Sequence, residues 1–288
     1  MPYDELKERV YRVNMALMEA GLVVLTWGNA SGADRKAGVM AIKPSGVEYS
    51  KLRPEDIVVL SLKTGETVEG SARPSSDTPT HLHLYQQFGS LGGVVHTHSR
   101  HATMFAQAGS AIPCFGTTHA DHFHGPVPVT RVLTEREVLD DYEANTGEVI
   151  VERFARIDPL HVPAVLVATH GPFTWGRDAA EAVHNAVALE EVARMALGTL
   201  QINADCEPVP AHILDKHFSR KHGPHAYYGQ KKPGRTTSIN RTVRPLAGWA
   251  AWHSPRCGIR RPRRRARWRR FRPAAAAAPP GWPMPGAA

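Results

Sequence analysis

The stretch Gly92-Gly93-Val94-Val95-His96-Thr97-His98-Ser99-Arg100-His101 joins a short apolar run to two histidines that are one residue apart. Side chains of a strand alternate between its two faces, so His96 and His98 point the same way and can share one ligand. Three protein ligands and an open position are the usual arrangement of a catalytic metal ion. The pair therefore predicts half of a metal site, although a lone His-x-His also fits ordinary surface or core histidines.

Two other segments offer the missing ligands. His170 closes the apolar run of residues 164–169, and Asp77 lies in Pro74-Ser75-Ser76-Asp77-Thr78. A second histidine at the end of an apolar run favours a metal site. Ser75 and Ser76 precede a helix that we expect over about residues 79–88, and a helix N-terminus attracts phosphate. The same residues also fit plain helix capping.

A second group of residues suits an anion. The expected strand 39–42 is followed at once by Lys43-Pro44-Ser45-Gly46, which offers a cation, a hydroxyl group and the backbone amide of a glycine turn. Such a turn can hold an anionic oxygen, although an ordinary turn with a solvated lysine fits the tetrapeptide equally well. In the polar segment 115–124, Asp121 is a candidate general acid or base and Thr117 a hydroxyl contact.

The periodicity of apolar residues predicts a mixed fold. Helices are expected over residues 3–20, 99–108 and 178–202, with a shorter helix after 213. Strands are expected at 22–25, 39–42, 57–60, 67–70, 149–151 and 165–167, with a small-residue loop at 26–32 and a sharp turn at 171–173. Regular βαβ alternation and a Gly-x-Gly-x-x-Gly loop are both missing, which favours a largely antiparallel sheet flanked by helices over a nucleotide-binding fold.

Charge divides the chain of 288 residues into two parts. Residues 231–288 hold 15 of the 35 lysines and arginines and none of the 27 acidic residues, so the formal charges are +15 there and −7 over residues 1–230. The basic segment is rich in Arg, Pro and Ala and lacks periodicity, so we expect it to be disordered. It could bind nucleic acid only nonspecifically, and a polyanion-binding protein is the non-enzymatic alternative.

Three isolated cysteines, Cys114, Cys206 and Cys257, form no metal or disulfide motif, which fits a reducing compartment. The first residues contain no apolar signal core, and no stretch has the length of a membrane span. We therefore expect a cytoplasmic protein without a membrane partner.

Taken in order, the motifs resemble those of the L-ribulose-5-phosphate 4-epimerase family, within the class II aldolase and epimerase superfamily. The resemblance spans residues 3–230. It is carried by the segments Leu25-Thr26-Trp27-Gly28-Asn29, Ile42-Lys43-Pro44-Ser45-Gly46-Val47, Pro74-Ser75-Ser76-Asp77-Thr78-Pro79-Thr80-His81, His96-Thr97-His98-Ser99-Arg100-His101-Ala102-Thr103, Gly116-Thr117-Thr118-His119-Ala120-Asp121, Thr169-His170-Gly171-Pro172-Phe173 and Ala226-Tyr227-Tyr228-Gly229-Gln230.

The resemblance implies an α/β fold, a three-layer αβα sandwich around a mainly antiparallel central sheet. It also implies a homotetramer with active sites shared between neighbouring subunits. The implied ligands of zinc, or of another divalent ion, are His96, His98, His170 and Asp77. The implied catalytic acid and base are Asp121 and Tyr228, and the implied substrate-binding positions are Asn29, Lys43, Ser45, Gly46, Ser75, Ser76, Thr117, Glu143, His217 and Arg220.

The activity that the resemblance implies is zinc-dependent epimerisation of L-ribulose 5-phosphate to D-xylulose 5-phosphate, a step of L-arabinose catabolism. The C4 hydrogen of this sugar is not acidic, so inversion requires cleavage and re-formation of the C3–C4 bond. The closest alternative is a class II aldolase that splits fuculose or rhamnulose phosphate. Those aldolases tend to carry Glu at the position of Asp77, which favours the epimerase.

Overall fold

The computed structural model describes residues 2–228. In this range seven strands form one sheet in the order β4-β3-β2-β1-β5-β7-β6, and every neighbouring pair is antiparallel. The strands are β1 (Asn29–Asp34), β2 (Val39–Ile42), β3 (Val58–Ser61), β4 (Thr67–Glu69), β5 (Gly93–His96), β6 (Ala164–Val167) and β7 (Gly171–Gly176). The helices are α1 (Asp4–Glu19), α2 (Thr78–Gln87), α3 (Arg100–Gln107), α4 (Thr117–Ala120), α5 (Glu135–Arg153), α6 (Ala179–Ile202) and α7 (Ala211–His222), with two 3-10 turns, η1 (Tyr49–Lys51) and η2 (Pro54–Asp56).

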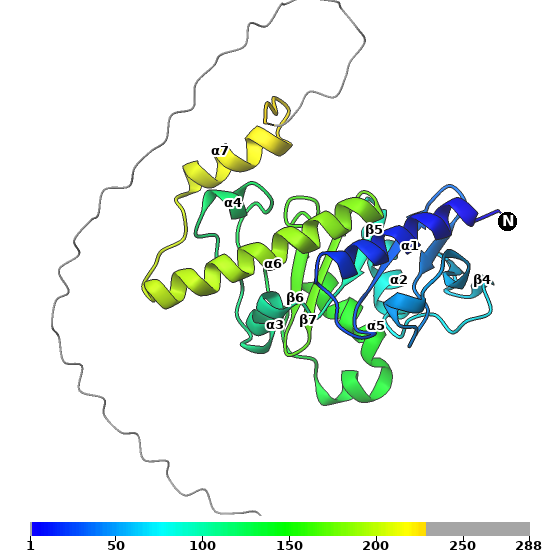
Figure 1. Cartoon of the computed structure of the whole chain (residues 1–288). Helices are drawn as coiled ribbons and strands as arrows, with labels where there is room; N and C mark the ends of the chain where they lie inside the picture. The colour runs from blue at the N-terminus through cyan, green and yellow to red at the C-terminus, as the bar shows by residue number, and fades with distance from the viewer. Residues whose placement is uncertain (1, 229–288) are drawn as a thin grey trace, which may run out of the picture. The chain divides into compact units, whose positions relative to one another are not determined.

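Helices cover both faces of this sheet (Figure 1). On one face, Met40 and Val94 pack with Leu84 of α2 and Ile150 of α5. On the other face, Val95 packs with residues of α1 and α6. Successive strand residues thus enter opposite cores, as the alternation of side chains in a strand requires. The predicted α/β fold with a mainly antiparallel sheet is confirmed.

The strand β5 comes from the stretch with which the sequence analysis begins, and it lies between β1 and β7. Its first residue, Gly93, lies against the start of α6: a Cβ atom there would be 2.4 Å from the Cα atom of Ala179. Only a residue without a side chain permits this approach. Gly93 therefore lets α6 dock on the strand that carries His96.

Four expectations about the elements were wrong. Residues 22–25 form no strand, because Leu22 is buried whereas Val24 and Leu25 face solvent, and Leu25 has a left-handed backbone with φ of 56°. Residues 149–151 belong to α5, which begins with a capping box between Thr134 and Glu137. The segment 26–32, expected as a loop, supplies most of β1, and the expected turn at 171–173 begins β7.

Residues 2–228 include no helix with the length and apolar character needed to cross a membrane. The predicted basic, disordered tail of residues 231–288 lies outside the described residues, and so does the end of the motif that carries Tyr228.

Candidate active site

A pocket of about 430 Å³ lies where the ends of β1, β2 and β5 meet the β6–β7 connection and the start of α2. Eleven of the predicted site residues line it: Asn29, Lys43, Ser45, Gly46, Ser75, Ser76, Asp77, His96, His98, Glu143 and His170. The remaining lining residues are Thr26, Trp27, Gly28, Pro44 and Tyr142. Segments that are far apart in the sequence thus bring the histidines and the turn Lys43-Pro44-Ser45-Gly46 to one cavity.

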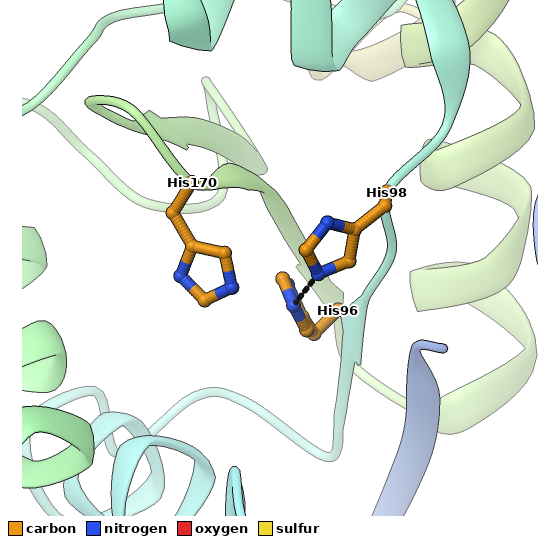
Figure 2. Close-up of side chains that lie close together, drawn as sticks. All are labelled: His96, His98 and His170. Carbon is orange, nitrogen blue, oxygen red and sulfur yellow. Dashed lines mark hydrogen bonds between the residues drawn. The ribbon is translucent and has the colours of Figure 1, made fainter. Parts of the chain in front are cut away.

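Three imidazoles face a common space in this pocket (Figure 2). His96 ends β5, His98 follows two residues later, and His170 lies in the connection between β6 and β7. One nitrogen from each ring lies within 4.8 Å of the others, and the Nε2 atoms of His96 and His98 are 3.1 Å apart. Imidazole nitrogens in this arrangement can hold a divalent metal ion through three ligands and leave further positions open.

The three rings are suited to metal binding because they are neutral. Burial lowers the pKa of His96 to about 3 and also lowers the pKa values of His98 and His170. The Nδ1 atom of His96 donates to the carbonyl oxygen of Pro172 at 3.1 Å, which leaves its Nε2 lone pair free. The Phe173 ring stacks on His96 with 4.3 Å between the centroids and fixes the plane of the imidazole.

Asp77 lies beside these rings at the start of α2. Its side chain makes no capping bond to the helix but accepts a hydrogen bond from the Asn29 amide at 2.6 Å. Burial raises the pKa of Asp77, but the nearby histidines His96 and His81 and the bond from Asn29 outweigh burial and lower it. The carboxylate is therefore ionised, as a metal ligand or a close partner of one requires.

The opposite part of the pocket suits an anion. Lys43 is 1% exposed, and burial lowers the pKa of its ammonium group. The turn that follows has a left-handed glycine, Gly46, with φ of 70°. The backbone amide of Ser75 donates to the carbonyl oxygen of Lys43, which joins the two hydroxyl-bearing segments. The two segments contribute Lys43, Ser45, Gly46, Ser75 and Ser76 to the pocket lining, and phosphate oxygens accept hydrogen bonds from residues of these types.

Sequence reasoning missed Tyr142. The helix α5 is interrupted by non-helical backbone at Asp141, and the next two residues, Tyr142 and Glu143, both line the pocket. The Tyr142 hydroxyl lies 3.2 Å from Nδ1 of His170, so it is a hydrogen-bond partner of a metal-ligand candidate. Helical periodicity does not reveal a kink of this kind. The only indication in the sequence was that Tyr142 is next to Glu143.

The other five predicted residues form a separate cluster at α4 and α7, which lie side by side (Figure 1), with Asp121 just after α4 and Tyr228 in the segment after α7. Asp121 accepts two hydrogen bonds from Arg220, at 2.8 and 2.5 Å, and one from His217 at 3.1 Å. The Arg220 guanidinium lies 4.5 Å from the centre of the Tyr228 ring, and Thr117 is the first residue of α4. Among the described residues, none of these five lines the metal-ligand pocket of the same chain.

The Asp121 carboxylate is ionised in this cluster. Burial raises its pKa, but the hydrogen bonds from Arg220 and His217 outweigh burial and lower it. A carboxylate in this state is a proton acceptor.

Comparison with known proteins agrees with this geometry. A family model described as the class II aldolase and adducin N-terminal domain matches residues 8–197. Two relatives, from Salmonella paratyphi A and Salmonella typhi, are named L-ribulose-5-phosphate 4-epimerase UlaF; each is 57% identical over 228 residues, which are 79% of this chain and 100% of the relative.

A solved structure named L-fuculose 1-phosphate aldolase is similar with a TM-score of 0.64 and 25% identity, covering 75% of this chain and 95% of that one. The L-fuculose 1-phosphate aldolase from Glaciozyma antarctica has a TM-score of 0.62 at 15% identity, over 78% of this chain and 84% of that one, which shows the shared fold. The chain belongs to the class II aldolase family.

Proposed function

We propose that this chain is a zinc-dependent L-ribulose-5-phosphate 4-epimerase that forms D-xylulose 5-phosphate. The observation that carries the proposal is one pocket that is lined both by the three histidines and by a buried lysine beside a glycine turn. Relatives that bear this name match over their entire length at 57% identity, which supports the same activity. The scattered cysteines support a cytoplasmic location.

Different residues of the pocket serve different parts of the proposed reaction. A divalent ion held by His96, His98 and His170 supplies Lewis acidity towards substrate oxygens. Lys43 and the Ser45-Gly46 turn bind the phosphate, so the two-carbon aldehyde released by C3–C4 cleavage stays in the pocket. Retention matters because the fragment must rotate and recombine, whereas its escape would make the enzyme an aldolase.

The acid and base come from a neighbouring copy in this proposal. A group that moves a proton must come within hydrogen-bond distance of it, and the cluster of Asp121 and Tyr228 does not line the pocket of its own chain. We therefore propose a homotetramer in which these residues serve the adjacent pocket, one removing the C4 hydroxyl proton and the other returning a proton. Residues 1–230 form the catalytic domain, and residues 231–288 are a separate basic segment.

The activity is tested with the purified full chain and L-ribulose 5-phosphate. D-xylulose 5-phosphate should form, stop forming after chelation and form again after zinc is added. His98→Ala should abolish the reaction, whereas His184→Ala, at an exposed helix position outside the pocket, should leave it intact. Zinc-dependent splitting of L-fuculose 1-phosphate without epimerisation would refute the epimerase and support the aldolase.

The shared site is tested by mixing two inactive variants. Random exchange between His98→Ala and Asp121→Asn subunits should leave about one quarter of the sites with both functional groups, if each site joins two neighbours. Activity should therefore return on mixing. Two inactive variants that stay inactive after proven subunit exchange would show that Asp121 does not serve the pocket of a neighbouring copy.

A further inference from the structure

The Lys43 ammonium group is buried without an acidic partner. Within residues 2–228 its Nζ atom makes no ion pair, and its one hydrogen bond is a long contact of 3.4 Å to the carbonyl oxygen of Pro44. Burial of an unpaired charge is costly unless another group stabilises it. A group other than a carboxylate is therefore needed if the ammonium group is to keep its charge beside the pocket.

The ring of Tyr49 lies next to the Lys43 ammonium group and can stabilise it. The first residue of η1, it is 4% exposed, and the centre of its ring lies 4.9 Å from Lys43 Nζ. The face of an aromatic ring attracts a cation, most strongly where water is excluded. Unlike a carboxylate, the ring carries no net charge. It can stabilise the ammonium group and still leave the full positive charge available to an anionic ligand.

The hydroxyl group of Tyr49 connects the same ring to the other part of the pocket. It donates to the carbonyl oxygen of Gly28 at 3.0 Å, and burial raises its pKa, which keeps it protonated. Gly28 lies directly against β5, because a Cβ atom there would be 2.8 Å from the backbone oxygen of His96. Tyr49 thus contacts both Lys43 and the loop that packs on the strand with the metal-ligand candidates.

We propose that Tyr49 is a positioning residue for the substrate phosphate: its ring holds the Lys43 ammonium group at the pocket wall without neutralising it. The inference rests on the proposed function, since a sugar phosphate supplies the anion. An ordinary core tyrosine would affect phosphate binding only through stability. A tyrosine that acts through Lys43 affects it through the electrostatic character of the ring, which can be changed at almost constant shape.

The probe is inorganic phosphate, titrated calorimetrically into the full chain with metal chelated, at constant pH and salt. Tyr49→Phe keeps the ring and should keep the affinity within about twofold, since the cation–π contact is unchanged. Adding one, two and three fluorines to the introduced ring should weaken binding stepwise, to about 5- to 30-fold. Lys43→Met should weaken it at least about tenfold. Fluorinated phenylalanine at Phe123, a buried residue outside the pocket, is the matched control and should change nothing.

Equal affinity along the fluorine series, or undiminished binding by Lys43→Met, would overturn the role of Tyr49. A chain that epimerises the sugar but gives a flat series refutes this inference alone. Graded loss of phosphate in a chain without epimerase activity supports the inference and refutes the proposed function. Absence of phosphate binding by the unmodified chain overturns this inference, whereas the proposed function is decided separately by the epimerase assay.

Discussion

Replacing Glu190 by alanine is expected to loosen the start of α3 and thereby the segment that carries His98. The carboxylate of Glu190, on α6, accepts hydrogen bonds from the backbone amides of His101 and Ala102 at 3.0 and 3.1 Å and from His101 Nδ1 at 2.7 Å. The side chain of Ser99, the N-cap residue of α3, makes no capping bond. The carboxylate of Glu190, which comes from another helix, therefore caps the N-terminus of α3.

The magnitude follows from these contacts. A hydrogen bond to a charged group contributes about 1.5–3 kcal/mol, and we use the lower value because water can reach the first turn of α3 once the carboxylate is gone. Two backbone amides then give about 3 kcal/mol. For a domain of this size each kcal/mol shifts Tm by about 2–4 °C, so Glu190→Ala should lower Tm by about 6–12 °C.

Thermal unfolding followed by circular dichroism tests this value, with Glu191→Ala as the matched control. The Glu191 side chain is 51% exposed and its ion pair with Arg194 spans 3.6 Å, so its loss should shift Tm by no more than about 2 °C. Zinc affinity should fall in Glu190→Ala, because His98 lies two residues before α3. Equal Tm shifts in the two variants would refute the capping role.

Three further outcomes are expected. Gly93→Ala should prevent soluble expression, since its Cβ atom would lie 2.4 Å from Ala179, whereas Gly89→Ala, with open space around it, should express normally. Tyr142→Phe should weaken zinc binding about tenfold in competition with a chromophoric chelator, and unchanged affinity would rule out its hydrogen bond to His170 as a support for the metal site. Burial lowers the pKa of His119 to about 4, so its stabilisation is complete above about pH 6.5, the ordinary range of histidine, and is lost as pH falls towards 4. Urea unfolding between pH 7 and 4 should therefore show a pH slope smaller by up to about 1.4 kcal/mol per pH unit in His119→Asn, and identical slopes would contradict this.

Local chemistry made part of the site predictable. The spacing of His96 and His98 predicts that both side chains point the same way, and their nitrogens do lie close together, although β5 ends at His96 and His98 lies just beyond it. The turn Lys43-Pro44-Ser45-Gly46 was equally evident as a candidate anion site, since its residues are consecutive. Each of these groups keeps its expected relation in the structure because only a few residues of backbone determine it.

The failures have a different physical origin. Residues 149–151 are β-branched, yet the packing of Ile150 against the sheet and the capping box at Thr134 place them in α5. The small residues 26–32 suggested a loop, whereas residues 29–32 belong to β1 and residues 26–29 line the pocket. Gly32 instead accommodates α1, since a Cβ atom there would be 3.1 Å from a methyl group of Val10. A small residue indicates that another part of the molecule comes close to the backbone there, but the sequence does not show which part.

The cluster on α4 and α7 explains why Asp121 and Tyr228 belong together despite their separation in the sequence. Arg220 donates two hydrogen bonds to Asp121, and the same guanidinium packs on the Tyr228 ring. Charge on the carboxylate therefore orients the cation, and the cation orients the ring.

A carboxylate with three such donors is a weak base and gains basicity only when a donor turns away. In the proposed shared site, the arrival of a substrate oxygen between Asp121 and its partners would supply that change, so the cluster would reach its reactive state only at the pocket of a neighbouring copy.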